Sequence, residues 1–473
     1  MKRHTLVTLS LTIILIMILS ACNLPIPPQA AAIEMPSTTE NVNIENSEDS
    51  SPAAPTPALA GNFQEEGTPE PKPELTETAA IAETNIPAAT DEPFNLVAVG
   101  PEDFPEGINP LTGLPAANPE LLKFPPGLVS ISNFPSSARP QAGLNASPIV
   151  FELSVGEGMT RFLAMFYGQF PEQISGQTEG QAPGNGTGSE ENNDETANND
   201  NGTSTSGQNM SIGPIRSGRL PYEDIRSLYT GFLVMASAWE GVSQNLNQAS
   251  SVYGSDSDDI NSAMINVNQL QKMAESRAEG YPGSDFNLEG MKFSQTPPEG
   301  GQSANWLWIF YSARNQVQWQ YDPESGAYIR YDIKTDGSGK FVMSTDRLTG
   351  EPITKQNVIV IFAQHDYRAP TLIDIDMLNK PPMKALLFRD GEIHEIFWTT
   401  RFGEYEQSTG LLKPMRFVDS AGDPISLKHG QTWISVVSLS SYYAESRISQ
   451  EPFYPVVEEQ GTGLWLVRYK GKY

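Results

Sequence analysis

Seven polar side chains that could bind or transform a ligand are concentrated between residues 133 and 219. Four of them are arginines, whose planar guanidinium groups form paired hydrogen bonds with carboxylate and phosphate oxygens. If these side chains converge in the fold, they would bind an anionic ligand. The candidate ligand-binding residues are Asn133, Arg139, Glu152, Glu157, Arg161, Arg216 and Arg219.

The same residues allow two other interpretations. Arginine and glutamate beside strands commonly pair with each other, so the cluster could be an ion-pair scaffold without a pocket. Glu152 and Glu157 are also candidate catalytic residues, because a glycosidase uses two carboxyl groups as acid and as base or nucleophile. Such a pair would face an open cleft, with the carboxyl groups about 5 to 9.5 Å apart.

The sequence contains few residues for other kinds of catalytic site or for a metal site, because histidines are scarce. Apart from His4 near the N-terminus, the histidines are His365, His394 and His429, so the region of the arginine cluster has none. A Ser-His-Asp arrangement would have to join distant parts of the chain. The histidines also lack the spacing of zinc ligands. We therefore expect no metal and no cofactor, and we predict that these three histidines lie at the surface or in turns.

The only cysteine, Cys22, marks the end of an export signal. Two basic residues precede an apolar run over 6–19, which is followed by Ser-Ala-Cys. A charged start, an apolar core and a small-residue cleavage site describe a secretory signal, and Leu-Ser-Ala-Cys resembles the bacterial lipobox, whose cysteine is lipidated. The apolar run of about 14 residues is shorter than the roughly 20 of a spanning helix. We predict a signal peptide over 1–21, and a lipid on Cys22 that anchors the exported protein to the outer face of the bacterial cytoplasmic membrane or cell envelope.

Two segments have the composition of disordered chain. Residues 22–95 are rich in Pro, Glu, Ala and Thr, and residues 175–209 are rich in Gly, Asn, Ser and acidic side chains. Neither contains enough apolar surface to offset the entropy of ordering. We interpret the first as a tether and the second as an insertion within a domain. Together they hold −18 of the formal net charge of −27, and the acidic balance argues against nucleic acid as a partner.

The remaining residues, 96–302 and 303–473, are long enough for two cores. In the first, short apolar runs bounded by Gly and Pro predict strands, and capping and periodicity predict helices over 221–229 and 266–279. In the second, strand-like runs alternate with tight-turn sequences and no helix is needed. The predicted fold is an α+β N-terminal domain with a mixed sheet, followed by a mostly-β C-terminal domain. The predicted strands are 127–133, 148–155, 160–167, 232–238, 306–313, 316–321, 327–333, 357–363, 383–388, 393–400, 431–437 and 463–469.

Six of the seven tryptophans fall in the second of these domains. Trp306 and Trp308 share one face of a strand, because side chains alternate between faces with a period of two. We expect these rings to belong to the core. An exposed pair would instead be a platform for sugar rings or for an extended peptide.

Several motifs, taken in order, resemble the YerB-like family of bacterial lipoproteins. In the first half they are Asn109-Pro110-Leu111-Thr112-Gly113, Ala138-Arg139-Pro140-Gln141-Ala142-Gly143-Leu144, Gly158-Met159-Thr160-Arg161 and Gly213-Pro214-Ile215-Arg216-Ser217. In the second half they are Tyr321-Asp322-Pro323-Glu324-Ser325-Gly326, Tyr328 with Arg330, Phe388-Arg389-Asp390-Gly391 and Gly430-Gln431-Thr432-Trp433.

The resemblance covers nearly all of 107–473 except the insertion, and it implies N- and C-terminal YerB-type domains of unknown function. The chain departs from the family pattern at 236–241, where Ala-Ser-Ala-Trp-Glu-Gly replaces a histidine followed by Gly-Gly-Ser. A Pro-His-Asn segment of the family is also missing, so no role is carried over from those histidines.

These observations predict a lipid-anchored cell-envelope protein that binds a ligand or partner through its first domain and is not an enzyme. The expected partners are the membrane, through the lipid on Cys22, and a cell-wall glycan or an envelope protein. Two alternatives stay open: an envelope glycan hydrolase using the glutamate pair, and a structural scaffold of an envelope protein complex.

Overall fold

The structure, a computed structural model, describes residues 97–171, 210–279, 286–447 and 458–472. The predicted signal peptide, Cys22, the tether up to residue 95 and the insertion over 175–209 lie outside these ranges. The described residues belong to one compact unit, Thr90–Tyr473. Among them, no helix combines the length and the apolar character that crossing a membrane requires.

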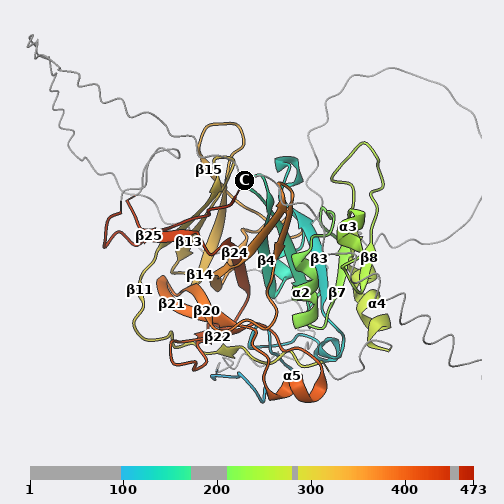
Figure 1. Ribbon diagram of the computed structural model, residues 1–473, viewed down its shortest axis with the longest axis horizontal. Coiled ribbons are helices and arrows are strands. Elements are labelled where there is room, and N and C mark those ends of the chain that lie inside the picture. Colours follow the sequence, from blue (N-terminus) through green and yellow to red (C-terminus); the bar gives the residue numbers. More distant parts are fainter. Residues whose placement is uncertain (1–96, 172–209, 280–285, 448–457, 473) are drawn as a thin grey trace, which may run out of the picture. The chain divides into compact units, whose positions relative to one another are not determined.

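A large sheet of eleven strands runs through the described part of the chain (Figure 1). In spatial order its strands are β11 (Gln302–Ser303), β21 (Glu392–Thr399), β20 (Met383–Arg389), β17 (Asn357–Ala363), β24 (Thr432–Ser438), β4 (Ile149–Gly156), β5 (Met159–Phe166), β3 (Gly127–Ser132), β7 (Phe232–Met235) and β8 (Ala249–Ser251), with β22 (Arg416–Val418) paired to β21.

A second sheet of seven strands comes entirely from the C-terminal half. Its order is β15 (Phe341–Met343), β14 (Ala327–Ile333), β13 (Asn315–Asp322), β12 (Trp306–Ser312), β26 (Leu464–Arg468) and β25 (Tyr442–Glu445), with β16 (Thr354–Lys355) paired to β14. Four further pairs are β1 (Ile108–Asn109) with β2 (Leu114–Pro115), β6 (Ser211–Ile212) with β9 (Ile265–Asn266), β10 (Lys292–Phe293) with β23 (Ser426–Leu427), and β18 (His365–Ala369) with β19 (Leu372–Ile375).

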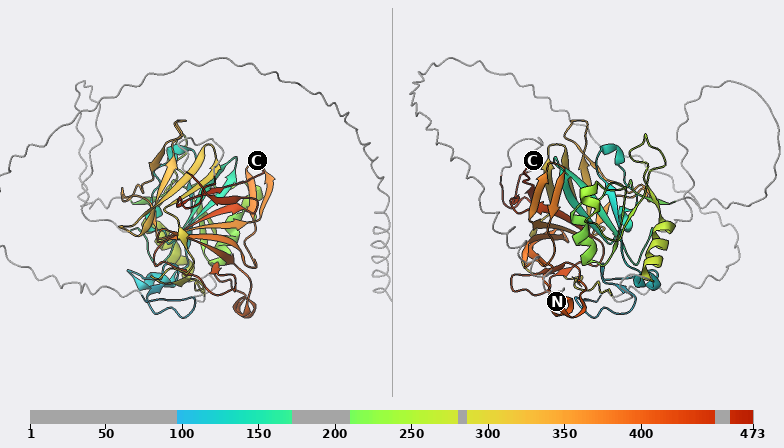
Figure 2. Two further views of the ribbon diagram at one scale, coloured as in Figure 1. Left: turned by 90° about the vertical axis from the view of Figure 1, so that its left-hand side faces the viewer. Right: turned by 45° about the vertical axis from the view of Figure 1, so that its right-hand side comes forward.

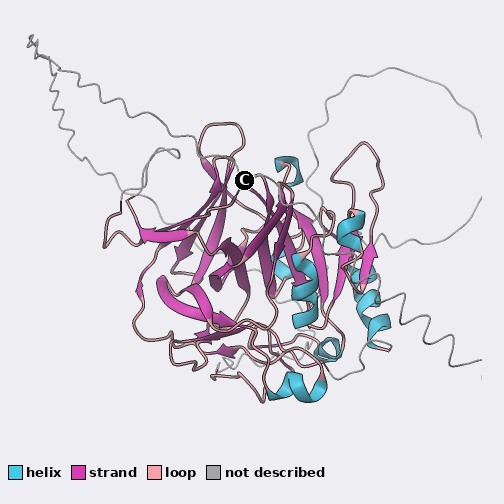
Figure 3. Cartoon of the chain, viewed as in Figure 1, coloured by secondary structure: helices cyan, strands magenta, loops and turns pink. Residues whose placement is uncertain are grey.

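The helices are few and short, and most lie near β3, β7 and β8 (Figure 3). The α-helices are α2 (Pro221–Leu228), α3 (Glu240–Ser243), α4 (Val267–Ala278) and α5 (Glu404–Thr409), and the 3-10 helices are η2 (Pro119–Lys123), η3 (Ser136–Ala138) and η4 (Leu144–Ala146). The two helices predicted in the first half are confirmed as α2 and α4. The prediction that no helix follows residue 303 is wrong, because α5 forms there. Its first turn is stabilised by the Glu406 side chain, which accepts from the Gly403 N–H.

All twelve predicted strands are present, with their ends displaced by at most a few residues. The strands at the centre of the large sheet, β4, β17 and β24, are buried at every position. Strands covered on both faces are apolar throughout rather than alternating. This explains why continuous apolar runs in the sequence, such as that of β17, were sufficient to locate them.

The two halves of the chain share the large sheet. β4 from the first half pairs in parallel with β24 from the second, with Glu152 opposite Ser435. Strands from both halves therefore run side by side, as further views show (Figure 2). One face of this sheet packs on α2, and the other packs on the smaller sheet and on α4. The sequence predicted two separate cores, whereas the boundary at 302/303 falls inside one folded unit.

Two buried side chains from the second half hold the Ala138–Leu144 motif and the short helix after it. The Asp346 carboxylate accepts from the backbone N–H groups of Gly143 and Asn145, at 3.0 and 2.8 Å. The Lys355 ammonium donates to the Leu144 carbonyl at 2.8 Å and to the Gln431 side chain at 2.6 Å. Burial lowers the pKa of Lys355 to about 7, against the opposing effect of Asp346. These contacts fix the segment that carries Arg139.

Asp224 on α2 predicts a pH-dependent stability. Burial raises its pKa to about 6, aided by repulsion from Asp376 and Asp374, although the Met377 N–H donates to it at 2.8 Å. Because the folded pKa lies above the unfolded value of 3.8, its contribution is complete below pH 4 and is lost as the pH rises through 6. We expect Asp224→Asn to stabilise the protein at pH 7 by about 1 kcal/mol, after discounting for partial exposure.

The measurement is urea unfolding of wild type and Asp224→Asn at pH 4 and pH 7. The expected gain appears at pH 7 and is absent at pH 4. Asp258→Asn, at an exposed position, makes the same change of charge and serves as the control. An equal gain from both variants, or a gain that does not depend on pH, would contradict the role given to Asp224.

Candidate functional site

A tight hairpin between β4 and β5 places three of the predicted site residues, Glu152, Glu157 and Arg161. The two strands pair antiparallel, with Glu152 opposite Phe162 and Leu153 opposite Arg161. The turn needs positive φ angles, which are 53° at Glu157 and 70° at Gly158. Positive φ at two successive turn residues matches the twist of the flanking strands. Glu152 therefore lies on the central strand β4, where it is buried, while Glu157 lies exposed at the tip of the turn.

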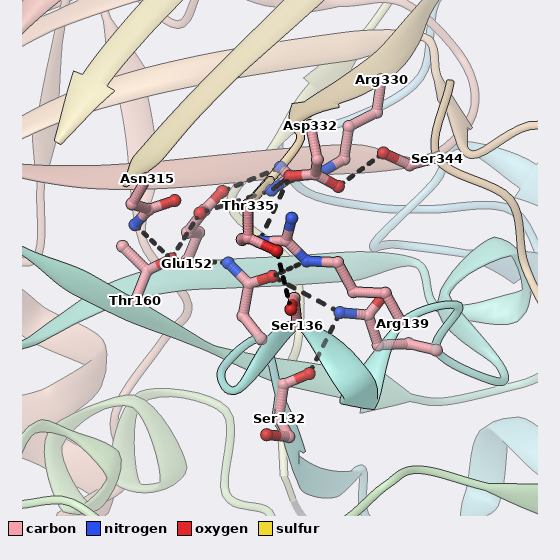
Figure 4. A network of polar contacts seen from close by, with 12 residues as sticks. Ser132, Ser136, Arg139, Glu152, Thr160, Asn315, Arg330, Asp332, Thr335 and Ser344 are labelled. Carbon is pink, nitrogen blue, oxygen red and sulfur yellow. Dashed lines mark hydrogen bonds and ion pairs between the residues drawn. The ribbon is translucent and has the colours of Figure 1, made fainter. Parts of the chain in front are cut away.

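Glu152 is the centre of a buried polar network (Figure 4). Its side chain is fully buried and accepts from Arg330 at 2.9 Å, from the Thr160 hydroxyl at 2.8 Å and from the Trp433 indole at 3.1 Å. The Arg330 guanidinium also lies over the rings of Phe162, Trp319 and Trp433. A buried carboxylate is tolerated when it is paired and hydrogen-bonded in this way. This network joins β4 and β5 to β14 and β24.

Asp332 extends the network on the other side of Arg330. It pairs with Arg330 at 3.0 Å and with Arg139 at 3.8 Å, and it accepts from the Ser344 hydroxyl at 2.5 Å. Burial raises the pKa of Asp332, but Arg139, Arg330 and the Ser344 hydroxyl outweigh burial and lower it to about 2. Arg139 thus belongs to an ion-pair scaffold, as one of the sequence interpretations proposed.

The other three predicted arginines behave differently. Arg161 donates to the Ser217 carbonyl at 2.7 Å, Arg219 to the Ser217 hydroxyl at 3.1 Å and Arg216 to the Ser132 hydroxyl at 3.2 Å. Among the described residues, no carboxylate lies within 4.0 Å of any of these guanidiniums. Burial lowers the pKa of Arg161 to about 10, with further lowering by Arg219 and Arg216 and an opposing effect of Tyr222. Three cations therefore lie close together, and among the described residues none of them forms an ion pair with a carboxylate, although the charge of Asp259 acts on Arg216.

A pocket of about 800 Å³ opens beside this cluster. Of the residues that the structure describes, four cationic side chains and one carboxylate line it. Arg161 and Arg219 are the inner cations, while Arg314 and Lys334 are exposed. The carboxylate is Glu157, and apolar side chains complete the wall. A concave site with a few convergent polar groups and an apolar wall is the usual form of a small-molecule site.

The structure separates the seven predicted residues into two groups. Asn133, Arg139 and Glu152 belong to the buried network, and none of them lines the pocket. Glu157, Arg161 and Arg219 line the pocket. Arg216 lies beside it and donates to Asn261 at 3.2 Å. Because Glu152 is fully buried and its oxygens are occupied, the glutamate pair does not provide two carboxyl groups facing an open cleft.

His365 and His394 lie in β18 and β21, so the prediction of a surface or turn position is wrong for these two, whereas His429 lies in the loop between β23 and β24. His365, His394 and His429 are 5%, 5% and 4% exposed. Burial lowers the pKa of all three, that of His365 to about 4. Within the described ranges, no group of three or more His, Cys, Asp or Glu side chains is placed to hold a metal ion.

The tryptophans of the second half mostly belong to the core, as expected. Trp319, Trp398 and Trp433 are fully buried, and Trp308 donates to Gln316 at 3.1 Å. The exposed tryptophan among the described residues is Trp239, which is 67% exposed and lies in the first half. The structure therefore offers no platform at Trp306 and Trp308 on one exposed face.

Sequence reasoning missed the residues that β13 and β14 contribute to the site. Arg330, Asp332, Asn315 and Lys334 lie more than 140 residues from the β4–β5 hairpin, so no local spacing links them to it. Arg330 was visible only as part of a family motif. Its alternation with apolar neighbours on a strand could have indicated a buried charge in need of a partner.

The chain is similar in sequence to a known protein family over parts of both its halves. Residues 111–176 match the N-terminal domain, and residues 307–434 the C-terminal domain, of a family described as "Protein of unknown function (DUF3048)". The chain is 24% identical over 344 residues to "Putative lipoprotein YerB" of Bacillus subtilis (strain 168), over 69% of this chain and 85% of YerB.

The fold itself resembles that of a solved relative. The crystal structure of the YerB protein from Bacillus subtilis matches with a TM-score of 0.50 and 23% sequence identity. The match covers 70% of this chain and 97% of that one. The likeness extends over both halves of the chain and shows the fold.

Proposed function

Because this chain is a DUF3048 protein that carries both domains of that family and is homologous to YerB, we propose that it is an envelope protein that binds an anionic ligand in the pocket beside the arginine cluster. The ligand carries a carboxylate or phosphate group. The observation that carries the proposal is the imbalance of charge in the pocket, where four cations and one carboxylate line the wall.

The inner arginines support this proposal better than the exposed ones. Burial lowers the pKa of Arg161 and of Arg219, so burial opposes the charge of both. A buried cation ordinarily has a carboxylate partner within reach, as Arg330 has in Glu152. Arg161 and Arg219 lack such a partner among the described residues. An incoming carboxylate or phosphate would supply the counter-ion, with hydrogen bonds strengthened by charge on both sides.

The location of the protein is also part of the proposal. The lipobox-like sequence ending at Cys22 supports an exported protein anchored by a lipid, and so does the name of YerB. In that setting the ligand would be an anionic component of the cell wall or the acidic part of an envelope protein.

A sedimentation experiment tests the proposal. Residues 23–473 are mixed with purified bacterial cell wall in low-salt buffer, and the bound fraction is measured as the amount of wall is increased. We expect Arg219→Gln to require about tenfold more wall for half-saturation, because a charge-assisted hydrogen bond is lost. Binding should also weaken as salt is added.

Arg401→Gln is the matched control, since Arg401 is exposed and outside the pocket lining. It makes the same change of charge and should bind like wild type. Equal weakening by both variants would mean that net charge, and not the pocket, governs binding. Wild-type protein that stays in solution would contradict a cell-wall ligand.

A further inference from the structure

Thr160 has a hydrogen-bond pattern that fixes the orientation of two neighbouring asparagines. Its hydroxyl donates its single proton to Glu152 Oε1 at 2.8 Å. The same oxygen accepts from Asn133 Nδ2 at 2.9 Å and from Asn315 Nδ2 at 3.2 Å (Figure 4). A hydroxyl offers one donor and two acceptor positions, so Thr160 is fully used. Either asparagine, if turned over, would place its oxygen against an oxygen that has no proton to give.

The side-chain oxygens of Asn133 and Asn315 therefore point away from the Thr160 hydroxyl, and the two oxygens have different neighbours. Asn133 Oδ1 accepts from Arg139 Nε at 3.0 Å, which satisfies it. Asn315 Oδ1 is buried and has no hydrogen-bond partner among the described residues. Asn315 is 1% exposed and lines the pocket, whereas Asn133 does not. A buried acceptor left without a donor costs about 1 to 3 kcal/mol.

A second unpaired atom lies in the same pocket. Arg219 Nε is buried and has no partner within the described residues, while Arg219 Nη1 donates to Ser217 and to the Gly218 carbonyl. Arg219 and Asn315 both line the pocket, so its wall contains two residues that each have one unsatisfied buried atom, a donor on a cation and an acceptor on a neutral amide. A carboxylate or a fully ionised phosphate group could satisfy the first atom but not the second, because it carries no proton to donate.

We propose that the ligand of this pocket carries a hydrogen-bond donor, a hydroxyl or an amide N–H, close to its anionic group, so that Arg219 binds the anion while Asn315 Oδ1 accepts from the donor. This inference rests on the proposed function and narrows its ligand class. Acidic sugars, sugar phosphates and N-acylated amino acids have this chemistry. A pocket of about 800 Å³ has room for a ligand of that size.

Two matched pairs of ligands test the inference. Isothermal titration of residues 23–473 compares glucuronate with cyclohexanecarboxylate, and glucose 1-phosphate with cyclohexyl phosphate. Within each pair a six-membered ring and the anion are kept, while the hydroxyl donors and the ring oxygen, which donates no hydrogen bond, are removed. We expect the hydroxylated ligand to bind about tenfold more tightly in at least one pair. The pair that shows the preference identifies the anion as carboxylate or phosphate.

Asn315→Ala should abolish this preference by lowering the affinity of the hydroxylated ligand about tenfold. Remaining binding of the cyclohexyl ligand shows that the variant retains a folded arginine site. Asn133→Ala is the control. It removes the same kind of hydrogen bond to Thr160, but the side-chain oxygen that it removes already accepts from Arg139 and is not available to a ligand. It should keep the preference of wild type.

The outcomes separate this inference from the proposed function. Equal affinities within both pairs, or a preference that Asn315→Ala leaves intact, would overturn the donor inference while anion binding stands. If none of the four ligands binds, both proposals fail. If Arg219→Gln lowers the affinity of all four ligands equally while Asn315→Ala lowers none, the pocket recognises charge alone and the donor inference fails.

Discussion

Replacing Arg330 with methionine is expected to lower the free energy of unfolding by about 3 to 5 kcal/mol. The Arg330 side chain is 1% exposed and pairs with Glu152 at 2.9 Å and with Asp332 at 3.0 Å. Methionine fills much of the same volume but leaves two buried carboxylates with fewer partners. The effect is therefore one of uncompensated charge more than of lost packing. Urea unfolding at pH 7 measures it.

Arg368→Met provides the matched control. Arg368 also pairs with two aspartates, at 3.0 and 2.6 Å, but its side chain is 48% exposed. Surface pairs of this kind contribute about 0 to 1 kcal/mol. Equal losses from the two substitutions would contradict the buried network. A second test combines Arg330→Met with Glu152→Gln, and the double variant should lose less than the sum of the single losses, because the glutamine carries no uncompensated charge.

Acid adds an independent readout of the same network. The pKa of Asp332 is lowered to about 2 by Arg139 and Arg330, which outweigh its burial, and its ordinary value is 3.8. A depressed folded pKa contributes stability that is complete above the unfolded value and is lost as the pH falls through the folded value. Wild type should therefore lose this contribution between about pH 4 and pH 2, and Arg330→Met should lose less of it over that range.

Replacing Gly156 with alanine is expected to cost about 3 kcal/mol or more. Gly156 ends β4 with a φ angle of 103°, a conformation that L side chains rarely adopt. An added Cβ would overlap the Pro370 carbonyl oxygen, and it would lie 2.8 Å from that carbonyl carbon and 2.9 Å from Thr371 Cα. These atoms are backbone in the turn between β18 and β19, so they cannot move aside as a flexible side chain would. Thr371 also lines the pocket.

Gly422→Ala separates strain from overlap. Gly422 has a similar φ angle of 93°, but no heavy atom lies within 4 Å of an added Cβ. Its alanine variant should lose about 1 kcal/mol from backbone strain alone. Urea unfolding of both variants gives the comparison. If the two losses are equal, the β4–β5 turn is not packed on the β18–β19 turn.

The strands were predictable because their signal is local. The runs that became β4, β17 and β24 are mostly apolar, with few polar residues such as Glu152 in β4 and Ser435 in β24. This pattern depends only on neighbours in the sequence. Turn chemistry predicts positive φ angles at Gly143, Gly156, Gly158, Gly213 and Gly218, and the structure confirms all of these except Gly218. α5 escaped prediction because it is six residues long and lacks a hydrophobic period.

The sequence by itself determined the longer strands, the principal helices, the export motif at Cys22 and two arginines of the pocket wall, Arg161 and Arg219. Only the tertiary structure decided what each charged side chain does. Arg139 and Arg161 are of one residue type in neighbouring motifs, yet Arg139 meets Asp332, and Arg161 meets no carboxylate among the described residues. That difference arises because β14 brings Arg330 and Asp332 to the buried side of the hairpin, across nearly 180 residues of chain. Pairing at such separation depends on how the two sheets pack, and no local pattern of residues encodes it.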